Sequence, residues 1–305
     1  MGAVINSADE LVLDEIRDLA RHASIEINVG DLEDLRSSRA FLPPGSKVYV
    51  SCLPKQTWED TQRAARRLHE TGFEAVPHIP VRLLSDAQTL SRLLETLVET
   101  ARVREVLLIS GDYPRAVGPY SCVADVLRSG LLRQHGLRGV SIAGHPEGHP
   151  RVALADIRQA ETQKVVIADR EGLELTFVTQ FFFEATPFLD WVDELRRHGV
   201  RARLVGGLCG PARVTSLLKY AVRCGVGASI RALSARGASV MKLMAEHGPE
   251  TVMRALAEAR CAGESNFTGV HLFCFGGYLR TCEWLHRVAA GQFTLNDSGG
   301  FDVYG

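Results

Sequence analysis

The stretch EVLLISGD at residues 105–112 joins a run of apolar residues directly to a serine, a glycine and an aspartate. Its apolar part does not alternate with polar residues, as a strand with one solvent-exposed face does. It is typical of a parallel strand that helices cover on both faces. Seven further runs of this character occur along the chain, namely SIEINV (24–29), KVYVSC (47–52), EAVPHI (74–79), GVSIAG (139–144), LTFVTQ (175–180), RARLVG (201–206) and GVHLFCF (269–275).

The segments between these runs have the periodicity of helices, and several carry signals for a helix end. Ser7 and Glu10 have the spacing of a capping box before LVLDEIRDLA, which predicts an extra helix ahead of the first strand. Thr186 and Pro187 are the residue types of an N-cap and a first helical position, so they predict that a helix starts there, before FLDWVDELRRH.

Eight strand–helix units over 305 residues predict an α/β fold, the (β/α)8 TIM barrel, with the extra helix at its N-terminus. Between the last two apolar runs the pattern predicts two helices, at residues 230–247 and 249–262. The alternative fold is a doubly wound open sheet, which usually has about five or six strands and a glycine-rich first turn. The segment VGDLED (29–34) contains no GxGxxG. No linker divides the chain, so we expect one domain over residues 1–305.

The overall composition narrows the function classes. Hydrophobic residues make up 46% of the chain, charged residues 23%, and the formal net charge is −1. Such a balance argues against nucleic acid as the main partner, because phosphate neutralisation needs a basic surface. No apolar run approaches about 18 residues, so we expect no membrane span. The first residues lack the order of a secretory signal, and the seven cysteines include no CxxC pair, which predicts a cytoplasmic protein with reduced thiols.

Polar residues lie inside or directly after most of the apolar runs. Because the active site of a (β/α)8 barrel lies at the carboxyl ends of its strands, these residues are the candidates for a site. They are Glu26, Ser51, His78, Ser110, Gly111, Asp112, His145, Thr179, Gln180 and the glycine-rich segment 206–210.

Glu26 is the most informative candidate because it stands between Ile25 and Ile27. A carboxylate inside a strand is costly unless it is paired or faces a polar cavity. Burial favours its neutral form, which suits a general acid, and the alternative role is a structural ion pair. Asp112 is either functional or a turn residue. Gln180 either reads a donor and an acceptor on a flat heterocycle or forms a turn.

The segment AGHPEGHP (143–150) places His145 and His149 four residues apart, which on a helix would put two metal ligands on one face. A proline and a glycine lie between them, so no helix carries both, and we expect no metal site. The segment 206–210 is either a phosphate cradle or a tight turn. His78, considered alone, fits a core histidine.

The ordered set of motifs resembles the methylenetetrahydrofolate reductase family, whose members are flavin-dependent (β/α)8 barrels of one-carbon metabolism. The resemblance covers roughly residues 20–280. It rests on LLISGDYP (107–114), VSIAGHPEGHP (140–150) and FVTQFFFEATPFLDWVDELRRHGV (177–200), supported by SIEINV (24–29) and VPHIPV (76–81).

The resemblance implies roles for residues that match the family's motifs. Glu26 matches the glutamate that protonates the folate nitrogen, and Asp112 the aspartate between flavin and pterin. Gln180 matches the glutamine that contacts the pterin and the nicotinamide in turn. Tyr220 falls where the family has an aromatic residue that stacks on the substrate. The family's Asn-Arg after the last strand is missing, and Arg280 is its candidate substitute.

Flavin-binding positions follow from the same resemblance. Ser110 stands where many members have an arginine near the flavin phosphates, and Lys164 is the candidate for a phosphate-contacting lysine. The remaining matches to flavin-lining positions are Ser51, His78, Gly111, Asp112, Tyr120, Ala143 and His145.

The function implied is the reduction of 5,10-methylenetetrahydrofolate to 5-methyltetrahydrofolate, in methionine biosynthesis, with FAD as cofactor and NADH or NADPH as hydride donor. One alternative is the same barrel running methyltetrahydrofolate oxidation in a one-carbon catabolic pathway. Another is a flavin-free folate-binding subunit of a larger complex. A homo-oligomer formed through the outer helices is possible, with Trp191 or Trp284 contributing, although core packing explains tryptophan equally well.

Overall fold

The computed structural model describes residues 7–111, 113–149, 152–211 and 249–304. Eight parallel strands form a closed barrel in chain order. They are β1 (Ser24–Ile27), β2 (Lys47–Val50), β3 (Glu74–Pro80), β4 (Glu105–Ile109), β5 (Gly139–Gly144), β6 (Glu174–Phe181), β7 (Arg203–Cys209) and β8 (Gly269–Phe273). The pairing of β8 with β1 closes the ring, which confirms the (β/α)8 barrel and excludes an open sheet.

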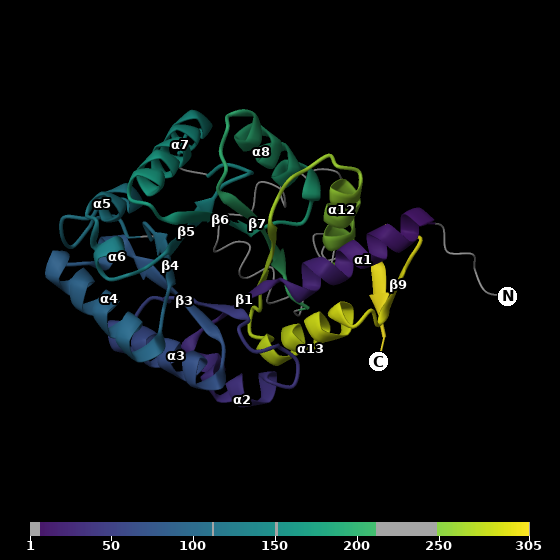
Figure 1. The fold of residues 1–305 in the computed structure, drawn as a ribbon, viewed down its shortest axis with the longest axis horizontal. Coiled ribbons are helices and arrows are strands. Elements are labelled where there is room, and N and C mark those ends of the chain that lie inside the picture. Colours follow the sequence, from purple (N-terminus) through teal and green to yellow (C-terminus); the bar gives the residue numbers. More distant parts are fainter. Residues whose placement is uncertain (1–6, 112, 150–151, 212–248, 305) are drawn as a thin grey trace.

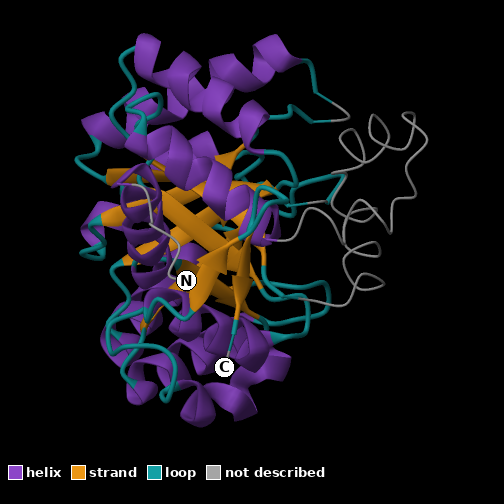
Figure 2. Cartoon of the chain, turned by 90° about the vertical axis from the view of Figure 1, so that its right-hand side faces the viewer, coloured by secondary structure: helices purple, strands orange, loops and turns teal. Residues whose placement is uncertain are grey.

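Helices surround the barrel, as the two views at right angles show (Figures 1 and 2). The longer ones are α1 (Ser7–Arg21), α3 (Trp58–Thr71), α4 (Ala87–Ala101), α7 (Leu154–Arg170), α8 (Ala185–Arg197), α12 (Pro249–Cys261) and α13 (Tyr278–Ala289). Shorter ones are α2 (Leu35–Ser38), α5 (Val123–Arg128) and α6 (Leu131–Gln134), with 3-10 turns η1 (Val29–Asp34) and η2 (Val81–Leu83). No helix in the described ranges is both long enough and apolar enough to cross a membrane.

The predicted N-terminal helix is confirmed as α1, which buries Ile16, Leu19 and Ala20 and packs against α12 and α13 (Figure 1). The predicted helix at 249–262 is α12, whereas 230–247 lies outside the described residues. Two short antiparallel strands that the sequence did not predict, β9 (Phe293–Leu295) and β10 (Phe301–Val303), follow α13.

The predicted start of α8 was slightly wrong. The helix begins at Ala185 with Glu184 as its N-cap, so Thr186 and Pro187 lie inside the first turn. Proline is tolerated there because the first N–H groups of a helix have no partner within it. Trp191 and Trp284 are 1% and 7% exposed, so both pack in the core of this chain.

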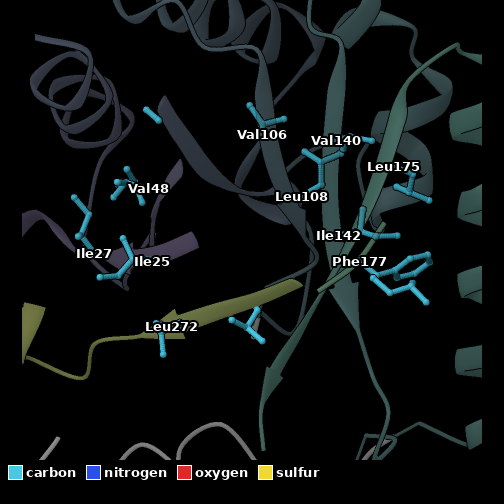
Figure 3. Close-up of a cluster of buried hydrophobic side chains, with 14 of the residues drawn as sticks. Ile25, Ile27, Val48, Val106, Leu108, Val140, Ile142, Leu175, Phe177 and Leu272 are labelled. Atoms are coloured by element: carbon cyan, nitrogen blue, oxygen red, sulfur yellow. The ribbon is translucent and has the colours of Figure 1, made fainter. Parts of the chain in front are cut away.

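The strands separate two apolar layers because successive side chains point to opposite faces. One set packs outward under the helices, among them Ile25, Val106 and Phe177 (Figure 3). The inward set forms a second cluster, made of Tyr49, Val76, Leu107, Val178 and Val205 with Ile109 against it. Full burial of one such side chain is worth about 1.5–3 kcal/mol, so both layers stabilise the closed ring.

A polar network lies among the inward side chains nearer the amino ends of the strands. Lys47, the first residue of β2, donates to Oε2 of Glu105 at 2.6 Å. The Ser141 hydroxyl donates to Oε1 of Glu105 at 2.5 Å and is also bonded to the Tyr49 hydroxyl at 2.9 Å. Burial raises the pKa of Tyr49, with the charge of Glu105 adding to the effect, so the phenol stays neutral. The network satisfies polar groups that would otherwise be buried without partners.

Candidate active site

Glu26 and two histidines meet inside the barrel. Since Ile25 and Ile27 pack outward under the helices, Glu26 points inward from β1. Its Oε2 atom lies 3.4 Å from Nε2 of His78 on β3 and 3.9 Å from Nε2 of His271 on β8. The Glu26 side chain is 20% exposed, so it is largely enclosed and still accessible. Three strands therefore supply one carboxyl–imidazole cluster.

His78 faces Glu26 as a neutral ring. Burial lowers the pKa of His78, the neighbouring His271 lowers it further, and the carboxylate of Glu26 opposes both effects. Nε2 of His78 is buried and makes no hydrogen bond with the described residues. His78 is thus buried, as expected for a core histidine. Its Nε2 atom nevertheless lies beside the carboxyl group of Glu26 without a hydrogen bond.

His271 is a member of the cluster that sequence reasoning missed. It is 1% exposed, and its Nδ1 is bonded to the Ser24 hydroxyl at 2.9 Å. The available signal was a histidine inside the apolar run GVHLFCF. The rule that identified Glu26, a polar residue within a continuous apolar strand, identifies His271 equally well.

The ends of β2 and β4 carry further predicted residues. The Ser51 hydroxyl donates to the carbonyl of Ile27 at 2.9 Å, so it ties the end of β2 to β1. Ser110 follows β4, and Gly111 has φ of +79°, a backbone conformation that favours glycine. Asp112, the predicted catalytic aspartate, lies outside the described residues, as does Tyr220.

The end of β5 carries two small residues, Ala143 and Gly144. A Cβ atom on Gly144 would lie 2.7 Å from the indole of Trp191, so the space beside this glycine is filled by α8. Ala143 pairs in register with Val178, an inward residue, and remains the small side chain on the interior side.

His145 is anchored by a buried carboxylate. Its backbone N–H donates to Oε1 of Glu161 at 3.1 Å, and its carbonyl accepts from Arg158 at 3.2 Å. Burial opposes ionisation of Glu161, but His145, Arg158 and Trp191 outweigh it and lower the pKa of this carboxyl. The Nδ1 atom of His145 lies 3.8 Å from Glu161 and makes no hydrogen bond with the described residues.

The segment around His145 is not helical, as expected from its proline and glycine. The rings of His145 and His149 are perpendicular, with centroids 6.2 Å apart. Within the described ranges, no group of three or more His, Cys, Asp and Glu side chains is arranged to hold a metal ion.

Gln180 lies at an irregularity between β6 and β7, where the strand register shifts. Its side chain is exposed, and Oε1 accepts from the backbone N–H of Phe181 at 3.4 Å. The neighbouring Thr179 hydroxyl accepts from the N–H of Gly207 at 2.8 Å. A Cβ atom on Gly207 would lie 2.6 Å from the Thr179 carbonyl oxygen, so the close approach of two strands requires glycine.

The glycine-rich segment 206–210 is not the tight turn that one alternative predicted. Strand β7 continues to Cys209, so Gly206 and Gly207 lie within the sheet. Packing accounts for both, because a Cβ atom on Gly206 would lie 3.1 Å from the ring of Phe188.

Three predicted residues have their described contacts away from Glu26. Tyr120 is 6% exposed, and burial raises the pKa of its phenol, with Asp86 adding to the rise. Lys164 lies on α7, where burial lowers the pKa of its amine although Glu161 opposes the shift. Arg280 is exposed on α13 and lines a cavity of about 870 Å³ between α12, α13 and the β9–β10 hairpin.

Fold and site define the class of protein as a (β/α)8 barrel with a carboxyl–imidazole cluster on inward faces of its strands. The family model for methylenetetrahydrofolate reductase matches residues 49–263, and the chain belongs to this family. The matched segment includes His78, His145 and Gln180, whereas Glu26 and His271 lie outside it.

Named relatives are similar over part of the chain. A 5,10-methylenetetrahydrofolate reductase from Pectobacterium carotovorum is 28% identical over 159 residues, covering 51% of this chain and 50% of its own. A methylenetetrahydrofolate reductase (NADH) from Arabidopsis thaliana is 26% identical over 150 residues, covering 45% and 25%. The alignments thus span about half the length of the bacterial relative and a quarter of the plant one.

Among solved structures, an uncharacterized protein from Clostridium thermocellum, described as binding two copies of 5-methyl-5,6,7,8-tetrahydrofolic acid, superposes with a TM-score of 0.56. The superposition covers 92% of this chain and 97% of that chain at 10% identity, so the likeness is one of fold.

Proposed function

We propose that this chain reduces 5,10-methylenetetrahydrofolate to 5-methyltetrahydrofolate, with FAD as cofactor and NADH or NADPH as hydride donor. The observation that carries the proposal is Glu26, held inside the barrel with Oε2 at 3.4 Å from His78 and 3.9 Å from His271. An accessible carboxyl group beside a neutral imidazole can act as a general acid that transfers a proton to the substrate. Family membership and the names of the relatives support the substrate.

The residues present fit a flavin. Nε2 of His78 and Nδ1 of His145 are buried without hydrogen bonds, near the carboxyl ends of β3 and β5. A flavin ring has carbonyl oxygens and ring nitrogens that such atoms can bond, and Ala143 leaves room between the two strand ends. The other residues proposed to hold the cofactor are Ser51, Ser110, Gly111, Asp112, Tyr120 and Lys164. When bound, FAD supplies the hydride carrier between the nicotinamide and the folate.

Glu26 supplies the proton in this proposal. Opening the methylene bridge of the substrate breaks a C–N bond, and the departing amine nitrogen needs a proton. Positioned general acids contribute roughly 10²–10⁴-fold to such steps. His78 faces the carboxyl as a neutral ring because burial lowers its pKa.

Substrate recognition is proposed for Gln180, Tyr220 and Arg280. The Gln180 side chain is exposed at the end of β6, and its amide offers a donor and an acceptor to a flat heterocycle. Asp112 is proposed to contact both flavin and pterin.

An absorbance spectrum followed by anaerobic half-reactions tests the function. We expect the purified protein to show flavin bands, to lose them on addition of NADH or NADPH, and to regain them with 5,10-methylenetetrahydrofolate as 5-methyltetrahydrofolate forms. Failure to bind added FAD would favour a flavin-free folate-binding subunit. A reduced flavin that the folate never reoxidises, but that 5-methyltetrahydrofolate generates from the oxidised enzyme, would favour the oxidative direction.

A further inference from the structure

The Glu26 carboxyl has a second neighbour, His271, whose ring is buried and packed against two aromatic rings. His271 is 1% exposed on β8. Its Nδ1 edge is bonded to the Ser24 hydroxyl at 2.9 Å, and its faces and edges meet the rings of Tyr49 and Phe273, with centroids 4.7 and 4.8 Å away. The remaining nitrogen, Nε2, lies 3.9 Å from Oε2 of Glu26.

We propose that His271 is a positioning residue for Glu26. The proposal rests on the proposed function, in which Glu26 delivers a proton, and it adds the group that holds Glu26 ready to do so. Ser24 precedes Glu26 by two residues on the same inward face of β1, so one strand carries both the anchor of the imidazole and the carboxyl it faces. The paired register of Ser24 with His271 keeps these three groups at the β1–β8 seam.

The two histidines flank the carboxyl from opposite sides of β1. His271 comes from the adjacent strand β8, whereas His78 comes from β3, beyond β2. Both approach the same oxygen, Oε2. A glutamate has three side-chain torsions to restrict, and an acid must lie within hydrogen-bond reach of the atom that it protonates.

Two amide substitutions of His271 distinguish the role of Nδ1, which bonds Ser24, from the role of Nε2, which faces Glu26. In His271→Asn, the short side chain reproduces the Nδ1 edge and keeps a partner for Ser24, but it ends before the position of Nε2. In His271→Gln, the longer side chain places an amide near the position of Nε2. If Nε2 positions Glu26, glutamine rescues what asparagine loses, although both replace the ring and leave a similar gap beside Tyr49.

The kinetic test uses the flavin-loaded protein and the ratio of its two half-reaction rates. We expect His271→Asn to slow flavin reoxidation by 5,10-methylenetetrahydrofolate by roughly 10–100-fold relative to flavin reduction by the nicotinamide, as a misplaced catalytic group does. His271→Gln should recover most of this loss, and Ser24→Ala should fall between them. In a Glu26→Gln background, His271→Asn should cause no further loss, because the two residues act as one unit.

A second readout requires neither flavin nor turnover. In protein labelled with ¹⁵N-histidine, Glu26→Gln should shift the Nε2 resonance of His271, and Ser24→Ala should shift its Nδ1 resonance. Absence of a response to Glu26→Gln would refute the contact. Equal slowing of both half-reactions by His271→Asn, or an additive loss in the Glu26→Gln background, would refute the positioning role.

The two proposals fail in different ways. A wild-type protein that binds flavin but is never reoxidised by the folate contradicts the proposed function, and the ¹⁵N comparison then decides the link between His271 and Glu26 by itself. Wild-type turnover with unchanged kinetics in His271→Asn contradicts the positioning role alone.

Discussion

The indole N–H of Trp191 on α8 donates a hydrogen bond to Oε2 of Glu161 on α7 at 3.2 Å. The same carboxylate accepts from Arg158 at 2.9 Å and from the backbone N–H of His145 at 3.1 Å. The buried carboxylate of Glu161 on α7 therefore fixes the backbone of His145, the residue that follows β5 and is proposed to contact the flavin.

Replacing Glu161 with glutamine should destabilise the protein by about 2–4 kcal/mol, because the Arg158 guanidinium then loses a buried ionic partner. Chemical denaturation followed by far-UV circular dichroism measures this loss. Glu194→Gln is the matched control, since Glu194 bonds the same Arg158 at 3.0 Å but its side chain is 35% exposed. The control should cost no more than about 1 kcal/mol. Equal losses in both variants would show that burial of Glu161 is not decisive.

Replacing Gly144 with alanine should cost about 1–3 kcal/mol, the usual penalty of overpacking. The added Cβ atom would lie 2.7 Å from Cη2 of Trp191, an indole bonded to Glu161 and unable to retreat freely. Thermal unfolding checks the prediction. Gly269→Ala, also in a barrel strand, is the control, because no atom lies within 4 Å of its added Cβ. Trp191→Phe should reduce the penalty at Gly144, and a penalty unchanged in that background would contradict the assigned clash.

His78 should make the protein less stable in mild acid. Its pKa is lowered in the folded state, chiefly by burial, so below the unfolded value of about 6.5 the unfolded chain binds more protons. Stability is then unaffected by His78 above that pH and falls as pH decreases below it, by at most about 1.4 kcal/mol per pH unit for one proton. The lowered pKa of Glu161 acts in a separate window, because its contribution is lost only at more acidic pH.

Urea titrations between about pH 7.5 and 5 measure this dependence, a range that lies mostly above carboxyl titration. His78→Asn should have a flatter profile over the range than the wild type. The charged and titratable neighbours Glu26 and His271 remain in the variant. An identical slope in the two proteins would show that His78 is not the responsible group.

Replacing Glu26 with glutamine should lower the rate of flavin reoxidation by 5,10-methylenetetrahydrofolate by about 10²-fold or more relative to flavin reduction by the nicotinamide. Glutamine keeps the size and the hydrogen-bonding atoms but has no acidic proton. Anaerobic stopped-flow absorbance resolves the two steps. A parallel fall in both rates would mean that Glu26 supports the site as a whole rather than delivering a proton to the folate.

Much of the architecture was readable from the chain. The eight continuously apolar runs correspond to β1–β8 within a few residues, and α1 and α12 lie where their patterns predicted them. Period and end signals are local properties, which is why they survive in sequence. Boundaries were less accurate, as Thr186 shows, because a helix start depends on packing as well as on cap residues. The β9–β10 hairpin was missed because its strands are only three residues long.

The site, too, was predicted only in part. Glu26 could be recognised from sequence alone because a carboxyl group within an apolar strand is costly unless it is paired or faces a polar cavity. The partners of Glu26 were decided by the tertiary structure. Ser24 and His271 are separated by 247 positions and become neighbours only when β8 closes the barrel against β1. Likewise, the indole of Trp191 occupies the space beside Gly144 only when α8 packs on the strands. Sequence determines which side chains each strand presents, whereas closure of the ring determines which of them meet.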